Sequence, residues 1–279
     1  MKNIQSKVAL VTGASMGIGA AVSKELARQG CKLALVARGR EGLEKIAGEI
    51  RAAGGQAQVF PCDMGDAEAV ARTVAAVEEA MGPIAILVNN AGAGTFKPLS
   101  EMSLKEAMLT VNLPFGAAIA ACHAVVPSMI SRREGQIVNL TSPASYMPLP
   151  YMVPYTSSRH AMMGLSLSLR EELERHGIGV SLVCPAKVDT GYFERNDADF
   201  GWYPRLANWF PVLQPEQVAV EVVRAIRGNY REHIFPFSLR WAMRVFQKAP
   251  YLNLVVLKAL GFFRPARQTK SDPIKDYDA

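Results

Sequence analysis

Cysteine and histidine are scarce in the 279-residue sequence, and the patterns missing around them exclude two classes of protein. The four cysteines are widely spaced, form no CxxC pair and have no histidine at zinc-ligand spacing; they are Cys31, Cys62, Cys122 and Cys184. No cluster of His, Cys, Asp and Glu has the spacing of a metal site. The sequence therefore predicts neither a disulfide-stapled miniprotein nor a metalloprotein, and we expect the cysteines to be buried thiols.

A leader sequence and a long uninterrupted apolar run are also missing. Residues 1–7 pass directly into an apolar run, without the hydrophobic core or cleavage site of a signal peptide. The longest uncharged stretch, residues 107–131, contains Asn112, Pro114 and Pro127, which favour a buried loop and helix over a membrane span. We therefore expect a cytoplasmic protein, with peripheral contact at a membrane surface left open.

Acidic residues are nearly absent from the C-terminal region. Residues 224–270 contain ten Lys and Arg but a single acid, Glu232, which gives this region a charge of +9 against +6 for the whole chain. Aromatic residues are interspersed among these charges, a mixture that suits an anionic membrane surface or an acidic partner. A solvated basic helix face above a packed apolar face is the alternative. No nucleic-acid-binding motif accompanies the charge, so we expect no nucleic acid partner.

Short apolar runs rich in Val, Ile and Leu alternate with helix-length segments of 3.6-residue periodicity. The expected strands cover residues 7–12, 32–36, 58–60, 84–89, 135–140, 179–184 and 232–236. The expected helices include residues 19–28, 42–53, 67–81, 155–175 and 216–228. This alternation predicts a doubly wound α/β domain with a parallel sheet, a Rossmann-type fold over residues 1–236. Such a sheet binds its ligands at the carboxyl ends of the strands.

The regular alternation ends after Cys184. Seven aromatic residues then occur within 19 positions; they are Tyr192, Phe193, Phe200, Trp202, Tyr203, Trp209 and Phe210. We interpret residues 189–215 as a lid over an apolar substrate, the alternative being that these rings pack on the protein's own core. Beyond the domain, residues 237–263 are expected to form a basic, aromatic helical extension, and residues 264–279 a flexible tail.

A glycine-rich turn follows the first expected strand, at residues 12–19, and leads directly into a helical segment. Glycines let a pyrophosphate approach the backbone, and the helix offers its unpaired N–H groups and positive dipole end. Position 38, at the end of the second strand, would be acidic in an NAD-binding protein, but it is Arg38, which suits a 2′-phosphate. The sequence therefore predicts NADP(H) as the cofactor.

Three motifs occur in a fixed order along the chain: TGxxxGIG at residues 12–19, Asn89–Gly92, and Ser142 thirteen residues before Tyr155. Together they resemble the short-chain dehydrogenase/reductase superfamily over roughly residues 5–195. One position departs from the family's YxxxK pattern, since residue 159 is arginine. A second departure is Ala186, where the family usually has glycine.

The resemblance implies a set of functional residues and an assembly. The catalytic residues would be Asn112, Ser142, Tyr155 and Arg159. The cofactor-binding residues would be Gly13, Ser15, Met16, Gly17, Ile18, Gly19, Arg38, Asp63, Met64, Asn90, Ala91, Gly92, Tyr155, Arg159, Pro185, Val188 and Thr190. In particular, Asp63 would hydrogen-bond the adenine and Asn90 would lie beside its ribose. A homodimer or homotetramer is expected, with the dimer favoured.

The expected chemistry also follows from the residue types. A carbonyl that receives a hydride develops negative charge on its oxygen, so it needs a proton donor and a second hydrogen bond. Tyr155 can supply the first and Ser142 the second; Thr141 and Ser145 flank Ser142, and only the spacing to Tyr155 favours it. Arg159, one helical turn beyond Tyr155, keeps the positive charge that makes a phenolate accessible, although its planar fork is larger than a lysine and never deprotonates.

Two functions follow from these observations. The first is an NADP(H)-dependent oxidoreductase that interconverts a ketone and a secondary alcohol on a lipophilic substrate, such as a sterol, a terpenoid or an acyl chain. The second is a catalytically impaired NADP(H)-binding scaffold that docks on a membrane or partner through its basic C-terminal region. The charge that Arg159 retains favours the enzyme.

Overall fold

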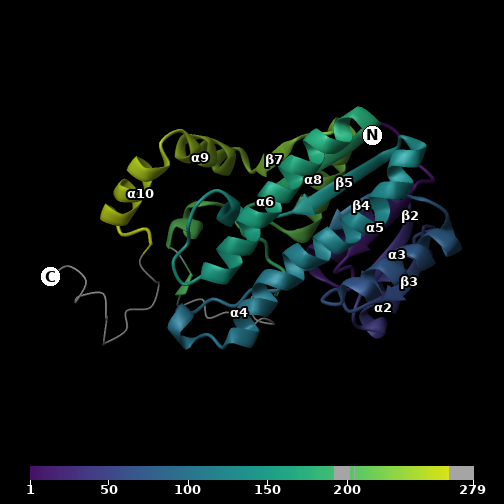
Figure 1. The fold of residues 1–279 in the computed structure, drawn as a ribbon, viewed down its shortest axis with the longest axis horizontal. Helices are drawn as coiled ribbons and strands as arrows, with labels where there is room; N and C mark the ends of the chain where they lie inside the picture. Colours follow the sequence, from purple (N-terminus) through teal and green to yellow (C-terminus); the bar gives the residue numbers. More distant parts are fainter. Residues whose placement is uncertain (192–201, 204, 264–279) are drawn as a thin grey trace.

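The computed structural model describes residues 1–191, 202–203 and 205–263, and Figure 1 shows their arrangement. Seven parallel strands form one sheet in the order β3-β2-β1-β4-β5-β6-β7. The strands are β1 (Val8–Thr12), β2 (Lys32–Ala37), β3 (Gln56–Pro61), β4 (Ile84–Asn89), β5 (Gly135–Leu140), β6 (Ile178–Pro185) and β7 (Glu232–Phe235). The predicted doubly wound α/β fold is confirmed, and the strand order reverses between β1 and β4, where such sheets bind ligands.

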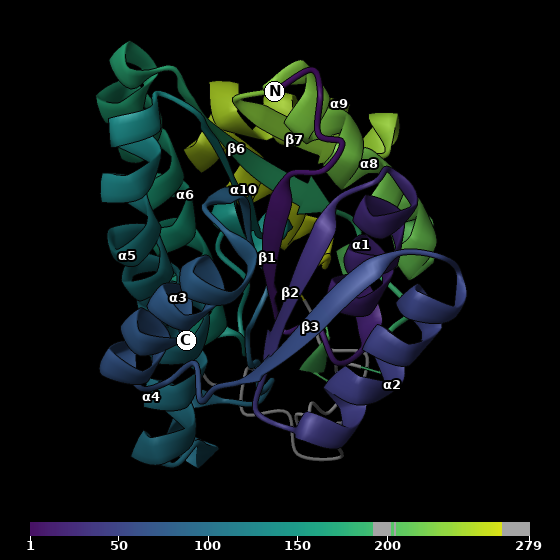
Figure 2. The same ribbon diagram turned by 90° about the vertical axis from the view of Figure 1, so that its right-hand side faces the viewer.

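Helices cover both faces of the sheet, as Figure 2 shows when the sheet is viewed between its two helical layers. One layer contains α1 (Gly17–Arg28), α2 (Arg40–Ala52) and α8 (Pro215–Gly228). The other contains α3 (Ala67–Met81), α5 (Ala117–Arg132) and α6 (Val153–Leu173). The helix α4 (Leu104–Val111) precedes α5, and α9 (Phe237–Lys248) and α10 (Pro250–Ala259) follow β7.

Two hydrophobic cores lie on opposite faces of the sheet because side chains of a strand alternate in direction. In β1, Ala9 and Val11 belong to the core under α1, α2 and α8, whereas Val8 and Leu10 belong to the core under α3, α5 and α6. Both faces are therefore dry, which explains why the strands read as continuous apolar runs. The four cysteines are free and buried, as expected, and burial raises the pKa of Cys122 to about 12.

The apolar stretch flagged by the sequence forms part of the second helical layer. Within the described residues, Leu104–Arg132 is the one helical stretch long and apolar enough to cross a membrane by length and composition. It consists of α4, a π turn at Asn112–Gly116 and α5. The inner face of α5 is buried against the core, through Cys122, Val125 and Met129. This packing is that of a helix that covers a sheet.

Candidate functional site

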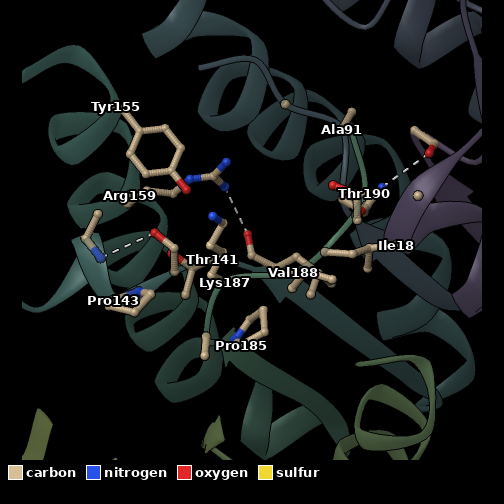
Figure 3. A pocket seen from close by; sticks show the side chains of 18 of the residues that line it. Ile18, Ala91, Thr141, Pro143, Tyr155, Arg159, Pro185, Lys187, Val188 and Thr190 are labelled. Atoms are coloured by element: carbon tan, nitrogen blue, oxygen red, sulfur yellow. Dashed lines mark hydrogen bonds between the residues drawn. The ribbon is translucent and has the colours of Figure 1, made fainter. Parts of the chain in front are cut away.

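A cavity of about 740 Å³ opens at the carboxyl ends of the strands, where the doubly wound topology places a ligand site. Its walls come from the glycine-rich turn after β1, the end of β2 and the loops after β4, β5 and β6. The beginning of α6 and the inner face of α9 complete it. Figure 3 shows Ile18, Ala91 and Thr190 on one side and Tyr155 and Arg159 on the other. The predicted cofactor and catalytic motifs therefore meet in one cavity.

The glycine-rich turn leaves backbone exposed where side chains would obstruct it. Gly13 and Gly17 adopt the left-handed conformation, with φ of 66° and 55°. A Cβ atom on Gly13 would lie 2.8 Å from Nδ2 of Asn90, and one on Gly17 would lie 3.2 Å from Cβ of Thr190. No side chain caps the N-terminus of α1, which begins at Gly17. Bare backbone at an uncapped helix N-terminus fits a pyrophosphate group.

Asn90 braces this turn from the neighbouring strand. Its Nδ2 donates to the carbonyl oxygens of Thr12 at 3.0 Å and Gly13 at 3.3 Å. The backbone N–H groups of Asn90 and Ala91 donate to the Thr12 hydroxyl, each at 3.0 Å. Asn90 lines the cavity, and its side-chain amide holds β1 and β4 together at the turn.

Arg38 lies at the rim of the cavity, directly after β2. Its side chain is exposed, and among the described residues it has no hydrogen-bond or ion-pair partner. The carboxylate that would bind a ribose 2′-hydroxyl is absent from this position, and the described residues that line the cavity include no Asp or Glu. The guanidinium is therefore available to an anionic group bound near the glycine-rich turn.

Tyr155 and Arg159 lie one turn apart in α6. The helix starts at Val153 with Pro154 in its first turn, where proline is compatible with a helix, so Tyr155 and Arg159 share the face that points to the cavity. The guanidinium carbon of Arg159 lies 4.8 Å from the centre of the Tyr155 ring, and Nη1 donates to the carbonyl oxygen of Leu140 at 3.2 Å. Both side chains are buried, so the positive charge acts on the phenol with little screening by water.

Ser142 supplies the hydroxyl that is least engaged by the protein. The hydroxyls of Thr141 and Ser145 contact each other, and Ser145 also donates to the carbonyl oxygen of Arg159 at 2.7 Å. Ser142 lines the cavity, and its Oγ accepts a 3.3 Å hydrogen bond from the N–H of Ala144. Its proton is therefore available for a ligand, as the spacing to Tyr155 predicts.

A chain of buried polar side chains fixes α6 against the sheet. Asn89 of β4 donates to Asn139 of β5 at 2.8 Å, and Asn139 donates to Ser166 of α6 at 2.8 Å. Buried amides are costly to leave unpaired, so this chain specifies the register of α6 on β4 and β5. The position of Tyr155 and Arg159 relative to the glycine-rich turn depends on that register.

The far part of the cavity is apolar, and sequence reasoning missed several of its residues. Its lining includes Phe96, Met147, Leu149, Met152, Tyr203, Leu206, Phe210, Leu239 and Met243. The ring of Phe96 packs edge-on against Tyr155, with 5.5 Å between ring centres, and against Tyr203 at 5.8 Å. Phe96 lies in a loop without a motif, so no sequence signal identified it. The helical spacing of Leu239 and Met243 marks a buried face of α9 but does not reveal what it faces.

Lys187 is a third cation of the cavity that the sequence motifs did not assign. It follows Ala186 at the end of β6, lines the cavity and points toward Tyr155 and Arg159 in Figure 3. Its Nζ lies 5.3 Å from the centre of the Tyr203 ring. With Arg38 and Arg159 it makes the described lining positively charged, because no acidic residue belongs to it.

Three predicted site residues lie outside the lining of the cavity. Gly19 is buried beneath the turn, where a Cβ would lie 2.1 Å from the carbonyl oxygen of Gly13, so its role is to support the turn. Asp63 accepts the backbone N–H of Gly65 at 3.0 Å, and its neighbour Met64 lines the cavity instead. Asn112 is exposed, because it lies at the start of the π turn between α4 and α5. Asn112 is therefore not among the described residues that line the cavity.

The expected lid is only partly described, because Tyr192, Phe193 and Phe200 lie outside the described residues. Of the remaining aromatic residues, Tyr203 and Phe210 line the cavity. Trp202 packs on Tyr151 with 4.7 Å between ring centres, and Trp209 is exposed and contacts Phe262. Two of the described rings therefore face the cavity, and two contact other aromatic side chains. The described residues contain no group of three or more His, Cys, Asp or Glu that could hold a metal ion.

Comparison with known proteins identifies the scaffold. Residues 7–200 match the short chain dehydrogenase family. A 17-beta-hydroxysteroid dehydrogenase 13 from Mus musculus is 31% identical over 254 residues, covering 89% of this chain and 80% of its own. A fatty acyl-CoA reductase from Acinetobacter baylyi is 30% identical over 263 residues, covering 94% and 86%.

Solved structures agree with this result. A metagenomic short-chain oxidoreductase in complex with NADP superposes with a TM-score of 0.70 at 31% identity, over 84% of this chain and 98% of the other. A variant of the actinorhodin polyketide ketoreductase with NADPH superposes with a TM-score of 0.74 at 30% identity, over 84% and 97%.

Proposed function

The chain belongs to the short chain dehydrogenase family, and on that premise we propose that it is an NADP(H)-dependent oxidoreductase acting on a lipophilic ketone or secondary alcohol. One observation carries the proposal. Tyr155, with the Arg159 guanidinium over its ring, and Ser142 line one cavity together with the bare glycine-rich turn and a set of apolar side chains. A cavity with those three parts suits a nucleotide, a proton donor and an apolar substrate.

Three parts of this chain would contact the cofactor: the glycine-rich turn, the segment after β6, and Arg38. The turn from Gly13 to Gly17 would hold the pyrophosphate at the N-terminus of α1, and Val188 and Thr190, beyond β6, line the cavity next to this turn. Bound nicotinamide would supply or accept the hydride. Arg38 supports NADP(H) over NAD(H), because a guanidinium at this position suits a phosphate. Two solved neighbours contain NADP or NADPH, which agrees with this preference.

Tyr155 would exchange the proton with the substrate oxygen. A fixed positive charge nearby stabilises the phenolate that remains when the proton leaves. Arg159 supplies that charge over the ring, and its bond to Leu140 fixes where the charge lies. Ser142 would donate a second hydrogen bond to the same oxygen, which orients the substrate and stabilises charge that develops there.

The substrate class is inferred from the apolar region. Side chains such as Met147, Met152 and Leu239 offer contact area without polar groups to satisfy, so they favour a substrate with a large apolar surface. Relatives are named as a hydroxysteroid dehydrogenase and a fatty acyl-CoA reductase, and one solved neighbour is a polyketide ketoreductase. These names agree with a sterol, a terpenoid or an acyl chain as the substrate.

Cofactor titration is the first experiment. NADPH and NADH are titrated into the purified chain while energy transfer from protein aromatics to reduced nicotinamide is followed. We expect NADPH to bind at least ~10-fold more tightly, a difference of about 1.4 kcal/mol. Equal affinities would contradict the role of Arg38. Binding without turnover across a panel of apolar ketones would favour the nucleotide-binding scaffold instead, with Arg159 as the impairing residue.

Self-association remains a separate proposal. Exposed apolar side chains occur on α4, α5 and α6 at Leu104, Met108, Ile119 and Val153. Such residues on neighbouring helices support a contact with a second copy of the chain. Light scattering after size-exclusion chromatography would measure the mass, and a monomer at micromolar concentration would contradict this proposal.

A further inference from the structure

The outer faces of α9 and α10 expose large apolar side chains that the fold does not use. On α9, Phe237 is 74% exposed and Trp241 64% exposed, and Val245 continues this row at the same spacing of four residues. On α10, Tyr251 is 85% exposed, and Leu252, Val255, Val256 and Leu260 are also exposed. We call these eight side chains the α9–α10 outer face. All eight lie between residues 237 and 260, unlike single exposed apolar residues scattered over a surface, which are ordinary on any protein.

The packing of the two helices differs from that of an ordinary surface helix. The inner face of α9 is buried through Leu239, Met243 and Phe246. In α10, by contrast, no residue is buried, although most of its side chains are apolar. A helix of this composition normally gains its stability by burying an apolar face. The contacts that would bury this face of α10 therefore come from outside the described chain.

The charges beside this face are all positive. Residues 237–263 contain Arg240, Arg244, Lys248 and Lys258 and no acid. Arg244 pairs with Glu232 at 3.1 Å, while no described acidic residue pairs with the other three. At 100° per residue, Lys248 lies within about 40° of Phe237 and Trp241 around α9. Cations and aromatic rings thus share one side of the helix.

We propose that the α9–α10 outer face docks on the surface of an anionic lipid bilayer. Trp and Tyr side chains favour the depth of the lipid headgroups, and neighbouring Lys and Arg side chains bind the phosphates. A docking site for another protein would instead be depleted in lysine at its centre. Residues 237–263 contain no acid, which favours docking on an anionic surface and disfavours docking on a cationic one.

Docking through the α9–α10 outer face would bring the cavity close to the bilayer. Leu239 and Met243 on the inner side of α9 line the cavity, so the docking face is the back of one cavity wall. Figure 1 places α9 and α10 at the end of the molecule opposite α2 and β3. A substrate dissolved in the bilayer would then have a short route to the cavity, a point that rests on the function proposed above. The docking itself does not depend on that function.

Co-sedimentation with vesicles tests the proposal, using the full chain without cofactor. Vesicles of phosphatidylcholine alone are compared with vesicles that also contain phosphatidylserine. We expect binding to the anionic vesicles only, and a loss of at least ~10-fold when salt is raised from about 0.1 M to about 0.5 M. The double variants Trp241→Ser/Val255→Ser and Lys248→Glu/Lys258→Glu should each weaken binding by at least ~10-fold.

Matched controls come from exposed helix positions elsewhere. Val220→Ser on α8 removes an exposed apolar side chain and Lys45→Glu on α2 reverses an exposed charge, and we expect both to bind like the wild type. Thermal unfolding of every variant confirms that it is folded. Absence of vesicle binding by the wild type, or equal losses in the two controls, would overturn the proposal. If the wild type does not bind vesicles and the Trp241→Ser/Val255→Ser variant has a lower oligomeric mass than the wild type, the face would be assigned to contact with a second copy of the chain instead.

Discussion

The two halves of the cavity are built in different ways. The half around the glycine-rich turn is made of backbone: strand ends, glycines with positive φ and the N-terminus of α1. The half around Phe96 and Met243 is made of side chains that come from loops, α6 and α9. Backbone can present only N–H and C=O groups, which suit the phosphates and amides that nucleotide cofactors share. Side chains vary in shape, so the second half can specify one substrate.

The difference predicts how each half responds to substitution. In the glycine half, an added methyl group on Gly13 or Gly19 meets main-chain atoms that cannot move without displacing a strand or helix. In the side-chain half, a substitution meets other side chains that can repack. Binding of the cofactor and turnover of the substrate should therefore be separable by mutation.

Tyr155→Phe should give the largest effect on turnover, and it tests that separation. The substitution removes the hydroxyl and keeps the ring that packs against Phe96 and under Arg159. Loss of a proton donor costs about 10²–10⁴-fold in rate, so we expect kcat to fall by at least ~10³-fold while the Kd for NADPH changes less than about threefold. Steady-state kinetics and cofactor titration measure the two quantities. Retained turnover would remove Tyr155 from its role.

Gly19→Ala should damage the glycine half instead. Its Cβ would lie 2.1 Å from the carbonyl oxygen of Gly13 and 2.6 Å from Nδ2 of Asn90, so α1 must move away from the turn. We expect NADPH affinity to fall by ~100-fold, equivalent to about 2.7 kcal/mol. Gly48→Ala on α2 is the control, because a Cβ there meets nothing within 4 Å. It should bind NADPH normally and be slightly more stable, since alanine favours a helix by up to about 1 kcal/mol.

The same difference explains which parts of the molecule could be predicted from the sequence. Binding of a ligand by backbone groups needs glycine at defined positions, so the sequence predicts the glycine-rich turn that contains Gly13 and Gly17. The parallel sheet is predicted from the apolar runs. A cavity wall made of side chains has no comparable motif in the sequence. Phe96 and Met243 come from segments more than 140 residues apart, and only the fold shows that they share a cavity with Tyr155.

Family resemblance also placed residues that the structure does not bring to the cavity. Asn112 was expected among the catalytic residues, but it lies exposed at the start of the π turn Asn112–Gly116 and outside the described lining of the cavity. Lys187 lies in the same segment as Pro185, Val188 and Thr190 but has no role in the motif, and only the fold places it in the cavity. A local backbone irregularity such as the π turn follows from the packing of α4 and α5, and a motif of single residues does not report it.

Arg38→Ala should produce a smaller and selective effect within the glycine half. The exposed guanidinium has no described partner in the protein, so its removal should leave folding intact. A hydrogen bond to a charged group contributes about 1.5–3 kcal/mol, so we expect NADPH affinity to fall by roughly 10- to 100-fold and NADH affinity to stay unchanged. Titration with both nucleotides measures this. An equal loss for both would show that Arg38 supports the turn and does not recognise a 2′-phosphate.

Acid should lower the free energy of unfolding through His233, and this is the smallest of the predicted effects. His233 of β7 hydrogen-bonds Glu221 of α8 at 2.5 Å, beneath the start of α9. Burial lowers the pKa of His233, opposed by Glu221 and assisted by Arg240 and Arg224. The folded protein therefore binds this proton less readily than the unfolded chain. Stability should be constant above the unfolded pKa of about 6.5 and fall as the pH drops below it, by less than one proton's equivalent, about 1.4 kcal/mol per pH unit.

Denaturant unfolding between about pH 7.5 and pH 5.5 measures this dependence, with His233→Gln as the matched variant. Glutamine can still hydrogen-bond Glu221 but does not titrate, so the variant should lose less stability than the wild type over this interval. A wild type that gains stability as the pH falls would mean that Glu221 outweighs burial and that the pair is ionised in the fold. In that case an ion pair between His233 of β7 and Glu221 of α8 would help to hold the segment that leads into α9. The side-chain half, like the glycine half, would then depend on polar groups in fixed positions.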